Sequence, residues 1–192
     1  MKSYITDEDG FTGLEAAIVL IAFVVVAAVF SYVVLGAGFF TTQKSQEVVH
    51  TGVQQASSTL EIVGNVYGNS DDTGGINAVN FTIALAPGGT AVDFEKVVLT
   101  YSNATQLETL ARQTTIGAAA STKQWTLVAI KNDAGGNNWL LEKGEQFDIM
   151  AHPTSLIYKN DNFNLEVKPS TGSPLDIKRT IPAAVKNVNI LY

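Results

Sequence analysis

The pattern of hydrophobic and polar residues divides the chain into two unlike parts. Residues 16–43 contain no charged side chain, and nearly all of them are apolar. About 20 such residues suffice for a helix to cross a bilayer. A helix that is apolar all round needs apolar surroundings on every side. The pattern therefore predicts a long N-terminal helix that stays in a membrane as an anchor, or that leaves the membrane to pack in a polymer.

The segment that follows, residues 41–63, is amphipathic. Its apolar residues recur at alternating intervals of four and three, like a heptad seam: Val49, Val53, Ala56, Leu60 and Val63. No proline occurs between residues 13 and 64, so one helix is expected to continue to residue 64. At about 50 residues it would extend roughly 75 Å, which is longer than one bilayer requires. The seam would pack on the chain's own C-terminal part or on identical helices, and the pattern leaves both open.

The first ten residues do not fit an ordinary secretory signal. Such signals have a positively charged beginning and an apolar stretch of about 7–15 residues. Here Lys2 is outweighed by Asp7, Glu8 and Asp9, and the apolar stretch is longer. We therefore disfavour a signal of that kind.

Residues 65–192 have the texture of short β-strands. Alternating or β-branched runs end at clusters of Gly, Pro and Asn, and they occupy residues 81–85, 94–101, 125–130, 139–141, 147–150, 163–167 and 185–192. The runs at 125–130 and 139–141 flank a loop of turn-forming residues and are expected to meet across it. The predicted fold class is α+β: a long N-terminal helix followed by an antiparallel β-sandwich or barrel of immunoglobulin-like type, with one buried face and one wet face.

Composition argues against several classes of function. The net charge is −6, and Lys178-Arg179 is the only adjacent basic pair, so no nucleic-acid surface is expected. The absence of cysteine excludes disulfides, thiolate metal sites and cysteine nucleophiles. His50 and His152 lie far apart in sequence, and no nucleophile elbow or phosphate-binding loop occurs. We therefore expect no enzyme, no catalytic residues and no cofactor.

Two acidic pairs are candidate metal ligands. Asp71-Asp72 and Asp93/Glu95 offer oxygen atoms of the kind that bind calcium together with loop carbonyl groups. Acidic residues in loops are more often simply solvated, and we expect no metal site.

The residues at the start of the apolar helix carry a resemblance to a known family. The run Gly10-Phe11-Thr12-Gly13-Leu14-Glu15 resembles the class III signal of type IV pilin-like proteins. The longer run GFTGLEAAIVLIAFVVVAAVF is similar to the N-terminus of archaeal flagellins, or archaellins. This similarity covers roughly residues 10–60, and residues 87–101 and the ending VKNVNILY also resemble archaellin outer-domain sequence.

The resemblance implies a processing site. In that family a prepilin-type aspartyl peptidase cuts after the glycine before the apolar helix, which here is the bond between Gly10 and Phe11. Glycine leaves the backbone accessible because it has no side chain. Asp9 departs from the basic residue that the family commonly has before this glycine. The implied organisation is a cleaved leader at 1–10, a filament-core helix at 11–64 and an outer β-domain at 65–192.

Glu15 is the only charged residue within the apolar helix. A buried carboxylate is costly unless it is paired. Glu15 would pair with the new amino group of Phe11 in the same or a neighbouring subunit, or would simply benefit from its place near the helix N-terminus. A role in processing or assembly register remains a hypothesis.

Two sequons for N-glycosylation occur, at Asn80-Phe81-Thr82 and Asn103-Ala104-Thr105. Asn103 follows a predicted strand and is expected in an exposed loop, whereas Asn80 opens a predicted strand. The resemblance favours both sites, because archaellins are commonly N-glycosylated.

The resemblance implies a structural, non-enzymatic subunit of an archaellum filament for swimming motility. Its expected partners are identical subunits in a helical homopolymer, the aspartyl peptidase, the membrane before assembly, and the filament base with its motor complex. The expected location is an extracellular filament reached through the cytoplasmic membrane. Two alternatives are an adhesive type IV-like pilus subunit and a membrane-anchored β-domain that binds a ligand.

Overall fold

The computed structural model describes the backbone of residues 8–71, 74–133 and 135–192, and side chains from residue 13 onward except those of residues 56 and 57. Residues 1–7 of the predicted leader and Asp72 of the acidic pair lie outside the described residues. The chain divides into two compact units, Met1–Thr51 and Gly52–Tyr192.

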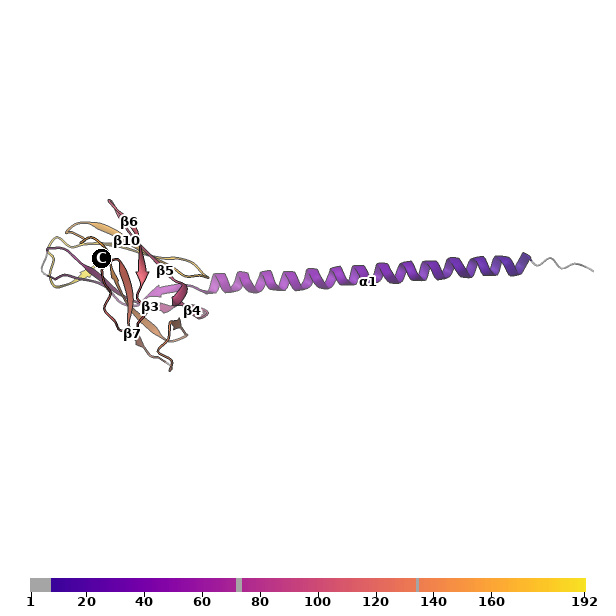
Figure 1. Cartoon of the computed structure of the whole chain (residues 1–192), viewed down its shortest axis with the longest axis horizontal. Helices are drawn as coiled ribbons and strands as arrows, with labels where there is room; N and C mark the ends of the chain where they lie inside the picture. The colour runs from indigo at the N-terminus through magenta and orange to yellow at the C-terminus, as the bar shows by residue number, and fades with distance from the viewer. Residues whose placement is uncertain (1–7, 72–73, 134) are drawn as a thin grey trace, which may run out of the picture. The chain divides into compact units, whose positions relative to one another are not determined.

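One helix, α1 (Glu8–Ser57), accounts for nearly all of the N-terminal part and is continuous along its length (Figure 1). It contains no proline, so each residue can contribute to the ladder of backbone hydrogen bonds. Beyond its end, the amide N and the hydroxyl Oγ of Ser58 both donate to the carbonyl oxygen of Gln54, at 2.9 and 2.8 Å. By length and composition, α1 is capable of crossing a bilayer.

The predicted continuation of this helix to residue 64 is wrong. Residues Leu60–Ile62 form strand β1, which pairs antiparallel with residues 83–85 of β3. Two flanking backbone bonds extend the pairing, from Ala86 N to Thr59 O and from Val63 N to Thr82 O, each 2.9 Å. The extended backbone of this segment therefore provides hydrogen-bond partners for β3. For this reason the segment forms a strand, although the spacing of Leu60 and Val63 also fits a helix.

Strands follow in close succession through the C-terminal part. After β1 they are β2 (Val66–Asn69), β3 (Ala78–Leu85), β4 (Val92–Asp93), the 3-10 turn η1 (Phe94–Lys96), β5 (Val98–Asn103), β6 (Leu107–Arg112), β7 (Gln124–Lys131), β8 (Leu140–Leu141), β9 (Gln146–His152), β10 (Asn162–Lys168), β11 (Leu175–Thr180) and β12 (Val188–Leu191).

These strands form a nearly closed barrel. The sheet runs in the order β11-β10-β5-β6-β7-β9-β3-β2-β12, and its pairs are antiparallel except the short parallel pair β6–β7. Its two end strands approach each other where Thr180 N donates to Tyr192 O at 2.9 Å. The predicted fold class, a long apolar helix followed by an antiparallel β-domain, is confirmed in its barrel form.

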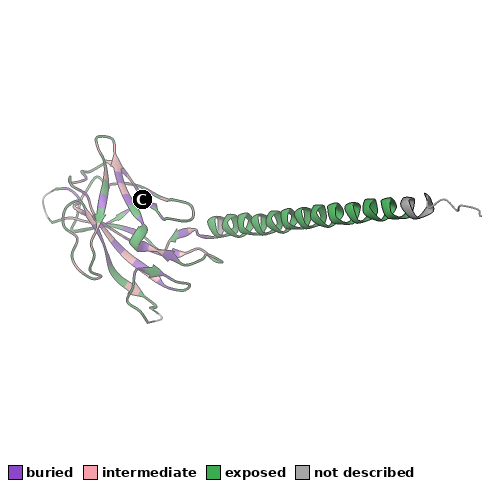
Figure 2. Ribbon diagram, turned by 45° about the vertical axis from the view of Figure 1, so that its right-hand side comes forward, coloured by how far each residue is buried: buried purple, intermediate pink, exposed green. Residues whose placement is uncertain are grey.

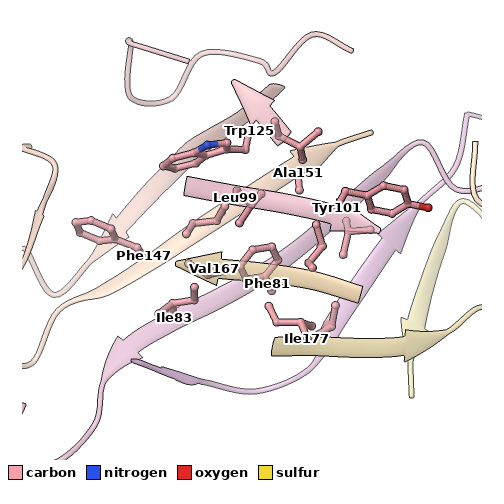
Figure 3. Close-up of a cluster of buried hydrophobic side chains, with 14 of the residues drawn as sticks. Phe81, Ile83, Leu99, Tyr101, Trp125, Phe147, Ala151, Val167 and Ile177 are labelled. Atoms are coloured by element: carbon pink, nitrogen blue, oxygen red, sulfur yellow. The ribbon is translucent and has the colours of Figure 1, made fainter. Parts of the chain in front are cut away.

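The barrel core is built by the alternation seen in the sequence. In β9, the side chains of Phe147, Ile149 and Ala151 are buried while those between them are half-buried, and Figure 3 shows such residues from several strands meeting inside. An aromatic cluster fills one part of the core. The ring of Phe94 lies edge-on to those of Phe147 and Trp125, with centroids 5.0 and 6.5 Å away. Trp125 meets Trp139 at 5.8 Å.

Two details of the predicted strands are wrong. Phe94 does not begin a strand but starts η1, because the Asp93 carboxylate accepts the amide of Glu95 and caps that turn. The runs at 125–130 and 139–141 do not pair, because β7 lies between β6 and β9 while β8 pairs with β4.

One glycine shows how closely the C-terminal unit is packed at its beginning. Gly172, between β10 and β11, has a positive φ of 109°, and a Cβ atom added there would overlap the carbonyl oxygen of buried Ser58. Glycine is required at this position for both reasons.

Candidate assembly helix and modification sites

The apolar part of α1 exposes its side chains in every direction. Residues 18–21 and 23–26 are all large and apolar, and each is between 53% and 71% exposed. Successive residues of a helix point about 100° apart, so these eight surround the axis completely. In Figure 2 the described residues of α1 are coloured as exposed along the helix. Fully burying one such side chain contributes about 1.5–3 kcal/mol, so this segment strongly favours an apolar environment on all sides.

Glu15 lies at the start of this surface. Its side chain is exposed and borders a shallow groove on α1 formed with Ala16, Val19, Leu20, Phe23 and Val24. Glu15 lies about one helical turn after Phe11, which places the two positions on the same side of α1. Gly10 and Phe11 also belong to α1, but the side chain of Phe11 lies outside the described part.

From residue 41 onward, α1 carries many polar side chains. Lys44 Nζ and Glu47 Oε2 form an exposed ion pair at 2.7 Å. Val48 and Val49 line a groove with Phe40 and Thr41 beside it. Of the predicted heptad seam, Val49 and Val53 lie on α1 with exposed side chains, whereas Leu60 and Val63 lie beyond its end.

The Asn103 sequon occupies the turn between β5 and β6. The side-chain oxygen of Asn103 accepts hydrogen bonds from the amide and hydroxyl of Thr105, at 2.9 and 3.0 Å, and from the amide of Gln106 at 2.8 Å. Its Nδ2 donates to the hydroxyl of Tyr101 at 3.2 Å. Ala104 and Thr105 are exposed. The sequon is thus presented as a defined turn at the surface.

Tyr101 supports this turn from inside. Its ring is buried and stacks with Phe163 at 6.1 Å, while Figure 3 shows its hydroxyl pointing away from the core cluster. Burial raises the pKa of Tyr101 to about 12, and the hydrogen bond from Asn103 acts in the opposite direction. The hydroxyl is therefore neutral at any physiological pH.

The Asn80 sequon has a different setting. Asn80 lies within β3, paired with Tyr67 of β2 on one side and Met150 of β9 on the other. Its side chain is half-buried, and its Oδ1 is buried without a hydrogen-bond partner among the described residues. In the sequence, the alternating run that begins after Asn80 indicates that this sequon lies in a strand, whereas the sequon of Asn103 follows a strand.

Two acidic residues of the β-domain, Asp93 and Asp133, form local bonds. Asp93 Oδ2 pairs with Lys96 Nζ at 2.9 Å, and that hydrogen bond lowers the pKa of Asp93. Asp133 accepts the amides of Gly135 and Asn137, which lowers the pKa of its carboxyl group. Within the described part of the chain, no three His, Asp or Glu residues are grouped so as to hold a metal ion.

Comparison with known proteins gives the family. The family model for archaeal-type flagellin matches residues 10–179. The chain belongs to the archaeal-type flagellin family. This flagellin is 39% identical to probable flagellin 1 of Archaeoglobus fulgidus, over 98% of this chain and 97% of that protein. It is 35% identical to probable flagellin 1 of Aeropyrum pernix, over 92% and 93%.

Solved structures agree with this assignment. The structure of the archaeal flagellum of Methanospirillum hungatei strain JF1 matches this flagellin with a TM-score of 0.72 and 36% identity, over 94% of this chain and 99% of that one. The crystal structure of flagellin FlaB1 from Methanocaldococcus jannaschii shares the fold, with a TM-score of 0.60 and 21% identity over 69% and 95%. The resemblance read from the N-terminal residues is confirmed.

Proposed function

We propose that this flagellin is the structural subunit of an archaellum filament, assembled by packing α1 among identical helices. The observation that carries this function is the apolar surface around the whole circumference of α1. Identical apolar helices would cover that surface in a polymer. The similarity to the Methanospirillum hungatei flagellum over nearly the whole chain supports the same function.

The motif before the apolar helix supports a further part of the proposal, the route to the filament. A prepilin-type aspartyl peptidase removes residues 1–10 by cutting between Gly10 and Phe11, and α1 lies in the membrane until it joins the polymer. The β-domain then forms the outer part of an extracellular filament whose base is turned by a motor complex. An open helical array requires contacts between two different surfaces of each subunit, because identical self-complementary patches would close a dimer.

Shearing filaments from the cell surface tests this function. We expect this chain in the sheared fraction, with an N-terminal peptide whose mass begins at Phe11. Recovery of the intact Met1 end only from membranes would instead indicate a permanent anchor and would refute the filament function.

Glu15 provides a separate prediction. Glu15→Gln removes the charge without changing the size of the side chain, and a lost charge-assisted hydrogen bond costs about 1.5–3 kcal/mol. We expect roughly tenfold less sheared filament, with the membrane-held subunit accumulating. The N-terminal peptide mass then shows whether cutting or assembly has failed.

Glu47→Gln is the matched control for this substitution. Glu47 forms an exposed ion pair, which contributes little, so its replacement should leave the filament yield unchanged. An unchanged yield for Glu15→Gln as well would show that the charge has no role in processing or assembly.

For N-glycosylation we propose Asn103. Its turn is exposed and ordered by its own side-chain bonds.

A further inference from the structure

The outer face of β2 and β12 carries a strip of exposed apolar side chains. Val188, Ile190 and Tyr192 alternate outward and are 61%, 40% and 81% exposed, while Asn189 and Leu191 between them are buried. Ile190 is paired in register with Tyr67 of β2, which is 39% exposed. Paired residues of antiparallel strands share a face, so the four form one surface, here called the β2–β12 strip.

The strip continues into a shallow hollow. Tyr67 borders it together with Val128, Asn80 and Thr82. The two charges nearby, Lys131 and Asp148, neutralise each other in an ion pair at 2.8 Å. Thr82 Oγ1 also donates to Asp148 at 2.6 Å. The Oδ1 atom of Asn80, which also lines the hollow, is buried without a hydrogen-bond partner among the described residues.

The opposite end of the sheet is built differently. The outward residues of β11 are polar or charged, namely Asp176, Lys178 and Thr180, and all three are exposed. Charged side chains on an edge strand discourage pairing with another chain. The outward side chains of β12 carry no charge, so the outward faces of the two end strands differ in the kind of contact they permit, although the strands approach each other at Thr180 and Tyr192.

We propose that the β2–β12 strip is a contact between neighbouring β-domains in the filament, and that its occupant is a second copy of this chain. This inference rests on the proposed function. Stable interfaces between free proteins bury more than about 1,000 Å² in total, which four partly exposed side chains and a shallow hollow do not supply. A partner that is already held nearby needs less area, because tethering raises its effective concentration to the millimolar range. Copies packed through α1 are such partners.

The proposed contact and a glycan at Asn80 exclude each other. Asn80 lines the hollow that continues the strip, and a bulky glycan attached there would cover both. We therefore expect Asn80 to be unmodified in filaments, in contrast to Asn103.

Single cysteines test the contact cleanly, because the chain contains none of its own. The variants are Ile190→Cys and Val188→Cys within the strip. Leu107→Cys serves as the matched control, since Leu107 is an apolar residue on β6 that is 75% exposed and outside the strip. Each full chain is labelled with a maleimide, once as the membrane-held subunit and once in intact sheared filaments, and the labelled fraction is measured by mass.

We expect both strip cysteines to react at least about tenfold more slowly in filaments than in the membrane-held subunit, with less than about threefold slowing at Leu107→Cys. Equal slowing at all three positions would overturn the inference. Protection that is already complete in the membrane-held subunit would also overturn it, because the cover would not be a second filament copy. A glycan found on Asn80 of filament protein would do the same. Absence of filaments from the unsubstituted chain would instead refute the proposed function, on which the inference depends.

Discussion

A lysine introduced on either side of the apolar part of α1 should abolish filaments. Val24→Lys and Val33→Lys place the charge about 180° apart around the axis, and both valines are more than half exposed in the isolated chain. In a packed bundle each lysine would be buried without a partner, at a cost of several kcal/mol. Since 1.4 kcal/mol corresponds to a factor of ten, we expect at least a hundredfold less chain in the sheared fraction.

The control for this prediction is Gln46→Lys, which adds the same charge to the polar part of α1. Lysine at the centre of a membrane helix also opposes insertion, by about 2.5–3.5 kcal/mol. The yield is therefore divided by the amount of chain in the membrane fraction. A normal yield from one of the two valine variants would show that α1 has a side that no neighbouring helix covers.

The second large effect concerns the folding of the β-domain. Phe94 is fully buried, and its ring touches both Phe147 and Trp125. Replacing a buried Phe by Ala leaves a cavity and typically costs 3–5 kcal/mol. We expect Phe94→Ala to lower the free energy of unfolding by about that amount, measured by urea titration of the full chain in detergent.

Tryptophan emission is a suitable signal for this titration. The chain contains two tryptophans, and both lie in the same aromatic cluster, where Trp125 meets Trp139. Leu107→Ala, at an exposed position, should change the free energy of unfolding by less than about 0.5 kcal/mol. A change below about 1 kcal/mol for Phe94→Ala would show that the cluster does not hold the barrel together.

Local alternation predicted the central strands well, because it reflects one buried and one wet face. The run at 163–167 became β10 with Phe163, Leu165 and Val167 inside. The sequence signal failed where a strand lacks that texture. β6, with the sequence LETLAR, is made largely of good helix formers and is a strand because β5 and β7 flank it.

The pairing of strands that are distant in sequence could not be predicted from local patterns. The loop of turn formers after β7 suggested a hairpin, but β9 offers a longer partner. The two strands pair from Gln124↔His152 to Lys131↔Gln146, with one register shift between Leu127 and Ala129. The end of α1 is a similar case. The spacing of Leu60 and Val63 fits a helix, but this segment forms a strand because it pairs with residues 83–85 of β3.

The candidate sites were recognisable from sequence to different degrees. Gly10, Phe11 and Glu15 stand out because a short motif precedes an apolar helix, which is a local property. The contrast between Asn80 and Asn103 depends on which strands flank each residue. The β2–β12 strip could not be recognised from the sequence, because Tyr67 and Ile190 come together only through the pairing of β2 with β12, the last strand of the chain.

The loop between β7 and β8 makes the filament a possible carrier of foreign peptides. Its described residues Asn132, Asp133 and 135–138 are all exposed, and the carboxylate of Asp133 closes it by accepting two loop amides. An epitope inserted at this loop, with Asp133 retained, would be displayed on each subunit without entering the barrel. A tag fused after Tyr192 would instead lie in the apolar strip, so display libraries and imaging labels belong at the loop.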